Sequence, residues 1–154
     1  MSVRPPAGTV TFLFTSIQDS PRRWDEAPAE MAAGQRVHDA IVQDAIEGHG
    51  GHVFATDGDG FCAAFATAAS AAEAAVEAQR KLRADGTIGF AVRMGLHTGE
   101  TVGRDANYSG SEVNRAARLM ALAHGGQILV SDTRIWPPCA SAISRAVRLT
   151  SLPE

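Results

Sequence analysis

The sequence predicts an α+β fold, in which a ferredoxin-like βαββαβ sheet carries one added helix and one added strand. Three observations predict it: a strand-like run opens the chain at residues 9–15, a β-hairpin is centred on residues 57–60, and stretches with helical periodicity separate the strands. The chain has 154 residues, of which 45% are hydrophobic and 20% are charged. This length and composition suit one compact domain, which we expect over residues 1–154.

The first strand is predicted at residues 9–15 because TVTFLFT is rich in β-branched and aromatic residues and contains neither Gly nor Pro. It should end at Ser16, and residues 17–23 should form a loop. A helix is predicted from about Pro28, where apolar residues begin to recur on one stripe. The sequence Gly-His-Gly-Gly at residues 48–51 should end this helix.

A hairpin is predicted next. Apolar runs at residues 52–56 and 61–65 flank Asp57-Gly58-Asp59-Gly60, where glycine tolerates positive φ and aspartate caps its own turn. The hairpin therefore presents carboxylates at its tip. Carboxylates on a rigid turn suit a hard divalent cation that also binds nucleotide phosphates. Asp-Gly is equally the ordinary chemistry of a tight turn, so the turn alone leaves both interpretations open.

Two helices and two strands are predicted after the hairpin. Residues 67–83 should form a helix whose alanine-rich face suits close approach to a sheet, and residues 88–98 a strand in which His97 is an ordinary hydrogen-bonded histidine. Residues 99–110 are predicted as a polar loop, 111–123 as a helix and 127–131 as a strand. Residues 132–154 are expected to be a divergent or truncated tail.

The predicted topology brings two segments together. In a ferredoxin-like sheet the first and second strands run in the same direction and are separated by the antiparallel third strand. The end of the first strand at Ser16 should therefore lie beside the hairpin tip at Asp59. Residues 17–23 and the tip are expected to form one site.

Composition argues against several classes of partner. The net charge of -3 gives no basic footprint for nucleic acid. No apolar run approaches 18 residues, and the first residues, MSVRPPAG, do not begin an apolar signal segment, so we expect neither a membrane span nor a secretory signal. Cys62 and Cys139 have no metal-ligand spacing and suit a reducing compartment. A cytoplasmic protein is therefore expected.

Four motifs occur in order on the predicted elements: GTVTFLFT at residues 8–15, GDGFCAAF at 58–65, RMGLHTGE at 93–100 and VNRAARLM at 113–120. Together they resemble the catalytic domain of class III nucleotidyl cyclases, over about residues 8–131. Several separate motifs in the right order are more specific than any single one. The resemblance implies the nucleotide cyclase fold.

The resemblance also implies an activity and a partner. Members of this family convert a purine nucleoside triphosphate, ATP or GTP, to a cyclic nucleotide plus pyrophosphate, with Mg²⁺ or Mn²⁺ bound by two carboxylates. The active sites lie at the interface of a head-to-tail dimer. We therefore expect a homodimer, or a heterodimer with a related cyclase domain.

Three positions match the family's functional residues. Asp59 matches the second metal carboxylate, and Asn114 with Arg118 matches the helix pair that orients the ribose and stabilises the transition state. Asn114 and Arg118 are four residues apart, so they are neighbours on one helix face. An ordinary polar surface pair is the plain alternative.

Three other positions depart from the pattern. Ser16 stands where the family has its first metal aspartate, and a neutral hydroxyl does not supply the charge that two cations need. Ala55 stands at the position of the base-reading lysine, and Asn107 at that of its partner aspartate, so both base-reading positions are substituted.

The loop that follows Ser16 also differs. Asp19 replaces a glycine of the phosphate loop and Pro21 removes a backbone N–H, and both changes oppose triphosphate binding. Asp57 and Asp19 are extra acids near the site, and Asp57 is the candidate rescue of the metal site. Asp57 lies at the start of the turn, where regular strand alternation ends, which argues against this rescue.

The matches and departures together predict a divergent cyclase domain with weak or no activity. The alternative is a non-catalytic dimerisation or regulatory module, a pseudocyclase that contributes Asn114 and Arg118 to a heterodimeric site. A third possibility is an unrelated ferredoxin-like domain that binds RNA or a metabolite. It is disfavoured because no predicted strand carries the paired aromatic residues that stack bases.

Overall fold

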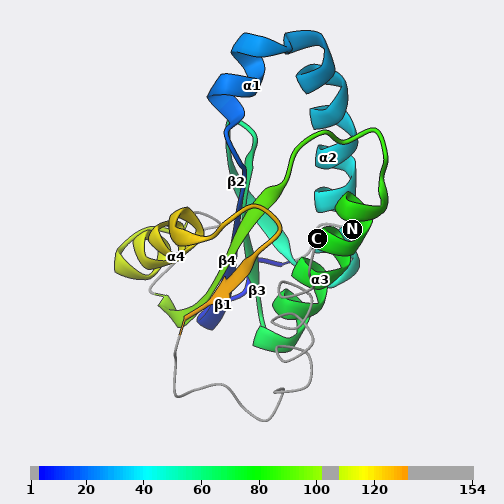
Figure 1. Ribbon diagram of the computed structural model, residues 1–154. Helices are drawn as coiled ribbons and strands as arrows, with labels where there is room; N and C mark the ends of the chain where they lie inside the picture. The colour runs from blue at the N-terminus through cyan, green and yellow to red at the C-terminus, as the bar shows by residue number, and fades with distance from the viewer. Residues whose placement is uncertain (1–3, 102–107, 132–154) are drawn as a thin grey trace.

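The computed structural model describes residues 4–101 and 108–131, which form a five-stranded sheet with helices on both faces (Figure 1). The elements in chain order are β1 (Gly8–Ile17), α1 (Ser20–Glu26), α2 (Pro28–Gly48), β2 (His52–Asp57), β3 (Gly60–Phe65), α3 (Ala68–Ala84), β4 (Val92–Thr101), α4 (Ser111–Leu122) and β5 (Ile128–Val130). The predictions for residues 102–107 and 132–154 lie outside the described residues.

The strand order confirms the predicted fold. The sheet runs β2-β3-β1-β4-β5, with β1 antiparallel to both β3 and β4, and β4 parallel to β5. The first four strands have the ferredoxin-like order, and α4 with β5 are the added helix and strand. Strands β1 and β2 run in the same direction with β3 between them, so the end of β1 lies near the turn that joins β2 to β3.

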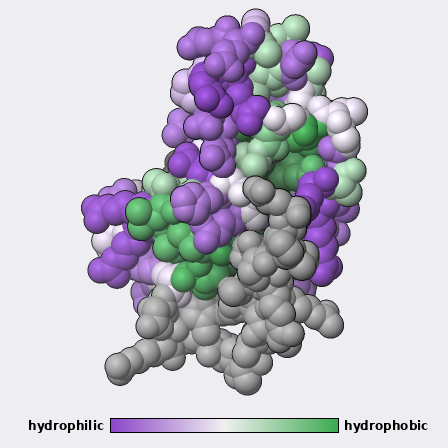
Figure 2. Space-filling model, viewed as in Figure 1, coloured by the Kyte–Doolittle hydropathy of each residue, from purple (hydrophilic) through white to green (hydrophobic). Residues whose placement is uncertain are grey.

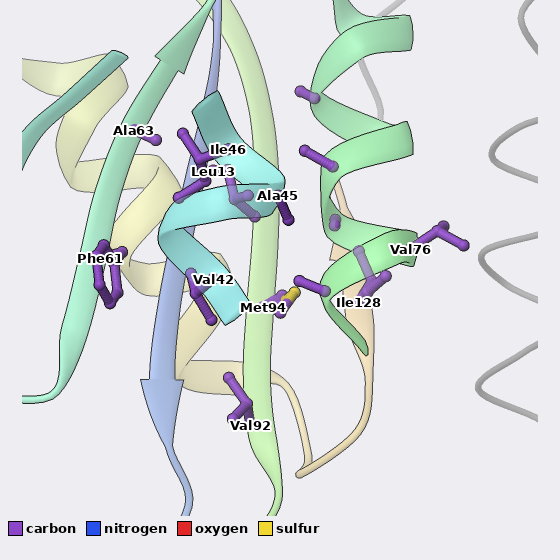
Figure 3. Packing of buried hydrophobic residues seen from close by; sticks show 14 of the residues in the cluster. Leu13, Val42, Ala45, Ile46, Phe61, Ala63, Val76, Val92, Met94 and Ile128 are labelled. Carbon is purple, nitrogen blue, oxygen red and sulfur yellow. The ribbon is translucent and has the colours of Figure 1, made fainter. Parts of the chain in front are cut away.

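Alternate residues of β1 serve two cores, as expected for a strand that is covered on both faces. Leu13 and Ile17 pack with Val42 and Ile46 of α2 in the larger cluster, which Figure 3 shows from close by. Phe12 lies on the opposite face, in a smaller cluster over which α4 packs. Helix α3 approaches the larger core through five fully or almost fully buried alanines, at positions 71, 72, 74, 75 and 78. The predicted small-residue face is confirmed.

Two predicted boundaries are wrong. Residues 17–23 are not a loop: β1 continues through Ile17, which is 1% exposed, and α1 begins at Ser20 with Pro21 in its first turn. The connection is Gln18 and Asp19, and Asp19 takes the left-handed conformation with φ 56°. Strand β4 begins four residues later than predicted and extends to Thr101, because its pairing with β1 continues to Gly8.

The described surface is divided by polarity. Figure 2 shows hydrophilic residues over α1 and over the outer side of α4, and hydrophobic residues near strands β4 and β5. Helix α1 has no buried residue, and it extends beyond the end of the sheet with the first part of α2 (Figure 1). Among the described residues, no helix is both long and apolar enough to cross a membrane.

Candidate active site

The hairpin tip is fastened to the end of β1. The hydroxyl oxygen Oγ1 of Thr15 accepts a hydrogen bond from the backbone N of Phe61 at 3.1 Å. Gly60 permits this approach, since a Cβ added there would lie 2.6 Å from the carbonyl oxygen of Thr15. Asp59, in the turn, is thereby held near Ser16 at the same end of the sheet.

Asp59 presents a carboxylate oxygen without a partner. Its Oδ2 is buried, and no hydrogen-bond donor of the described chain reaches it. Buried polar atoms in native proteins are almost always paired, so an unpaired carboxylate oxygen marks a place for a donor or a cation. Asp59 is therefore the best placed of the described residues at this end of the sheet to bind a ligand.

A guanidinium lies against the other side of Ser16. Arg93 of β4 pairs with Ser16 in the antiparallel register, and its Nη2 donates to Ser16 Oγ at 3.3 Å. Its Nη1 donates to the carbonyl oxygen of Ala121 at 3.4 Å, close to the end of α4. Its Nε is buried without a partner among the described residues. Arg93 thus joins the end of β1 to the end of α4.

Sequence reasoning missed Arg93. The available signal was a charged residue within the RMGLHTGE motif, inside an otherwise apolar strand. Gln18 was also missed: its Oε1 accepts from the backbone N of Gly125 at 2.7 Å and so ties the end of β1 to the loop between α4 and β5. Both contacts depend on which strands become neighbours, which local patterns do not reveal.

The donor set at this end of the sheet does not fit a pair of divalent cations. Within the described residues no group of three or more His, Cys, Asp or Glu side chains is arranged to hold a metal. Ser16 is neutral and Asp59 supplies one carboxylate. Asp57 is exposed, and the carboxylate of Asp19 lies 3.8 Å from the guanidinium of Arg22. A hard cation at this site would have Asp59 as its carboxylate ligand.

The base-reading positions are only partly visible. Ala55 is exposed on β2 and pairs with Cys62 of β3, while Asn107 lies outside the described residues. Burial, and to a lesser extent the negative charge of Asp57, raise the pKa of the Cys62 thiol to about 11. Cys62 is therefore a neutral thiol at physiological pH, as expected for a packing residue.

Asn114 and Arg118 lie on α4. Both are exposed, while Ala116 of the same helix is fully buried. The helix packs closely on β4 because Gly95 and Gly99 have no side chains. A Cβ added at Gly95 would lie 2.6 Å from the backbone N of Met120. The helix is therefore held tightly against the sheet, and the side chains of Asn114 and Arg118 lie on its exposed side.

Asn114 lies apart from Ser16 and Asp59, toward the other end of the sheet. Asn114 follows the start of α4, where Glu112 packs against Gly99. Gly99 pairs with Val10, six residues before Ser16 on β1, which is roughly 20 Å along a strand. The chain thus brings Ser16, Asp59 and Arg93 together and keeps Asn114 apart from them.

Two relatives illustrate the range of similarity. An uncharacterized protein of Mycobacterium tuberculosis is 43% identical over 129 residues, which are 82% of this chain and 44% of that protein. An adenylate cyclase of Lachancea kluyveri is 32% identical over 158 residues, covering 84% of this chain and 9% of that protein. The chain spans less than half of the length of either relative.

Solved structures have the same fold. An adenylate cyclase from Trypanosoma brucei in its monomeric state gives a TM-score of 0.78 at 24% identity, covering 83% of this chain and 75% of that one. The monomeric guanylyl cyclase domain of the RhoGC fusion protein from Blastocladiella emersonii gives 0.74 at 20% identity, covering 90% and 86%. An adenylate/guanylate cyclase/hydrolase from Silicibacter pomeroyi gives 0.70 at 26% identity, covering 94% and 83%.

The family described as the adenylate and guanylate cyclase catalytic domain matches residues 3–136, which includes all nine described elements. The match takes in each of the four motifs together with the strands and helices that carry them. Sequence, strand order and structural likeness therefore agree, and the chain belongs to the adenylate and guanylate cyclase catalytic domain family.

Proposed function

We propose that this chain is a divergent class III cyclase domain with weak or no cyclase activity of its own. The observation that supports this proposal is the environment of Ser16, where a neutral hydroxyl is hydrogen-bonded by the Arg93 guanidinium at 3.3 Å and the half-buried Asp59, with one buried oxygen, is the nearby carboxylate. Cyclisation needs charge neutralisation around the triphosphate. Loss of one positioned charge typically costs about 2.7–4 kcal/mol, or 10²–10³ in rate.

The base-reading positions act in the same direction. Ala55 offers neither a charge nor a hydrogen-bond donor beyond its backbone, so a purine would lose its side-chain contact there. In this proposal ATP or GTP remains the substrate class, and Mg²⁺ or Mn²⁺ would be bound through Asp59. We infer that the domain comprises residues 1–154 as one unit, with residues 132–154 as a divergent tail.

The test is cyclic nucleotide production by the purified chain with ATP or GTP and excess Mn²⁺. Asp59→Ala is the matched control because it removes the carboxylate whose Oδ2 is buried without a partner among the described residues. Turnover that is low and abolished by Asp59→Ala supports the proposal, as does turnover indistinguishable from that variant. Turnover in the usual enzymatic range, about 1 s⁻¹ or faster, would contradict it.

A second function is favoured by the exposure of Asn114 and Arg118 and by the distance of Asn114 from Ser16 and Asp59. Asn114 and Arg118 are exposed, and the start of α4, which carries Asn114, lies beside Gly99, roughly 20 Å along β1 from Ser16. A head-to-tail dimer would bring α4 of one chain to the carboxylate end of another. We propose that this chain supplies Asn114 and Arg118 to a related cyclase domain that has both metal carboxylates.

This second function predicts stimulation of an intact cyclase domain. Co-expression should raise its cyclic nucleotide output, and the double substitution Asn114→Ala with Arg118→Ala should abolish the increase. Arg115→Ala is the matched control, since Arg115 is exposed on the same helix and its guanidinium pairs with Glu112 of that helix. Equal stimulation by the wild type and the double variant would contradict this function.

A further inference from the structure

A buried histidine connects α4 to the sheet. His97 of β4 is 5% exposed. Its Nε2 lies 2.6 Å from Oε2 of Glu112 in the first turn of α4, and its Nδ1 lies 2.7 Å from Oγ of Ser131, just after β5. The ring, which belongs to β4, therefore bonds both the start of α4 and the residue that follows β5.

The neighbouring residues hold the carboxylate of Glu112 in this contact. Gly99 leaves the space that the carboxylate occupies, since any side-chain carbon at that position would overlap it. The hydrogen bond from His97 holds the pKa of Glu112 below its ordinary value. The second carboxylate oxygen, Oε1, lies 3.3 Å from Nη1 of exposed Arg115. The carboxylate is thus charged at neutral pH and is bonded on its buried side by His97.

The first turn of α4 has little else to fix it. Its N-cap residue is Gly110, with φ 107°, and no side chain caps the free backbone N–H groups. An uncapped helix start frays more readily than one whose first N–H groups are satisfied by a side chain. The hydrogen bond between His97 and Glu112 therefore stabilises the start of α4 in place of a side-chain cap.

The geometry of a helix relates this bond to the exposed residues. Successive residues are about 100° apart, so Asn114 lies about 200° around the helix from Glu112. Fixing Glu112 toward the sheet turns Asn114 outward. Arg118 follows one turn later, about 40° further round, and so points to nearly the same side as Asn114.

We propose that His97 and Glu112 are positioning residues that set the direction in which Asn114 and Arg118 leave α4. This inference rests on the proposed role of those two residues in a cyclase site. It adds a second pair of side chains, His97 and Glu112, which meet between β4 and α4.

The experiment has one arm that needs no activity. Amide hydrogen exchange of α4 is measured in the full chain, together with the ¹⁵N–¹H resonance of the Asn114 side-chain amide. Glu112→Ala should speed exchange about tenfold or more at the amides of residues 114–117, whose N–H groups donate to the carbonyl oxygens of residues 110–113, because the charge-assisted bond that fixes the start of α4 is lost. It should also shift the Asn114 resonance. Alanine favours helix more than glutamate does, so propensity would act in the opposite direction.

Two variants serve as controls. Glu112→Gln retains a group that hydrogen-bonds to His97, so it should preserve most of the protection and the Asn114 resonance. Arg115→Ala removes only the exposed contact to the same carboxylate and should resemble the wild type. Unchanged exchange and an unchanged Asn114 resonance in Glu112→Ala would overturn the inference.

The second arm uses the stimulation of an intact cyclase domain. Glu112→Ala should lower the stimulated kcat about tenfold with little change in KM, because misplaced groups lose transition-state contacts. Glu112→Gln should restore it. A change in KM without a change in kcat in Glu112→Ala would overturn the positioning role. Failure of the wild type to stimulate counts against the proposed function alone. The hydrogen-exchange measurement tests the role of His97 and Glu112 without any cyclase activity.

Discussion

Arg93 hydrogen-bonds Ser16 across the β1–β4 pair, with Nη2 3.3 Å from Oγ. The two residues lie opposite each other in the register, so their side chains leave the same face of the sheet. A positive charge therefore adjoins the position that a metal carboxylate occupies in active relatives, according to the resemblance.

Ser16→Asp should create a tighter divalent-cation site. The new carboxylate would join Asp59 at the same end of the sheet, and two carboxylates bind a hard cation better than one. Mn²⁺ affinity, measured by isothermal titration calorimetry, should rise at least about tenfold. Ser109→Asp adds the same charge at an exposed position near the start of α4 and should leave Mn²⁺ affinity unchanged. Equal affinity in both variants would contradict the prediction.

Acid should weaken the fold through Glu112. Its pKa is lowered in the folded chain mainly by the hydrogen bond from His97, so the ionised form is favoured by folding. The stabilisation is fully present above the unfolded pKa near 4.5 and is lost as the pH falls through the lower folded pKa. Urea unfolding should show a smaller acid loss of stability, between about pH 5 and pH 3, in Glu112→Gln than in the wild type. An equal loss of stability with falling pH in Glu112→Gln and the wild type would refute the role of Glu112.

Gly95→Ala should destabilise the domain by about 1–3 kcal/mol, because overpacking forces a shift of neighbouring backbone. The added Cβ would lie 2.6 Å from the backbone N of Met120 in α4, which is not a flexible side-chain end. Gly89→Ala is the matched control, since nothing lies within 4 Å of a Cβ there. Guanidinium unfolding of both variants gives the comparison, and a similar small change in each would show that α4 has room to move.

Cys62 should react slowly with iodoacetamide at pH 8, because its pKa is about 11 and the thiolate is the nucleophile. The measurement is made in a Cys139→Ser background, followed by mass spectrometry. Asp57→Asn should speed the reaction, since the negative charge of Asp57 contributes to the raised pKa. Thr56→Asn, a substitution at the exposed neighbouring position, should not. A rate that is independent of residue 57 would contradict the assigned cause.

The sequence allowed the fold to be predicted where local patterns decide the structure. The apolar run at residues 9–15 contains no breaker and became the central strand β1, and the Asp-Gly turn closed the hairpin. The predicted end of β1 was wrong because Ile17 pairs with Val92 of β4, and the backbone N of Gln18 then donates to the carbonyl oxygen of Ala91, just before β4, at 2.9 Å. These partners lie more than seventy residues away, and periodicity within one segment carries no information about them.

The candidate site was visible only in part for a related reason. Asp59, Asn114 and Arg118 were found because they lie within recognisable motifs, and their roles stay predictions. Arg93 was missed because its significance depends on facing Ser16, which follows from the register of two strands distant in sequence. His97 was expected to be an ordinary hydrogen-bonded histidine. It is hydrogen-bonded, and its partners are contributed by two segments that the sequence alone does not bring together.

The contacts of His97 also give its hydrogen bonds a direction. An ionised Glu112 accepts only, so Nε2 of the ring carries the hydrogen in that bond. In the neutral imidazole Nδ1 is then the acceptor, and the hydroxyl of Ser131 must donate to it. The tautomer of one ring is thus set by a carboxylate on α4, and it dictates how a hydroxyl beside β5 is oriented.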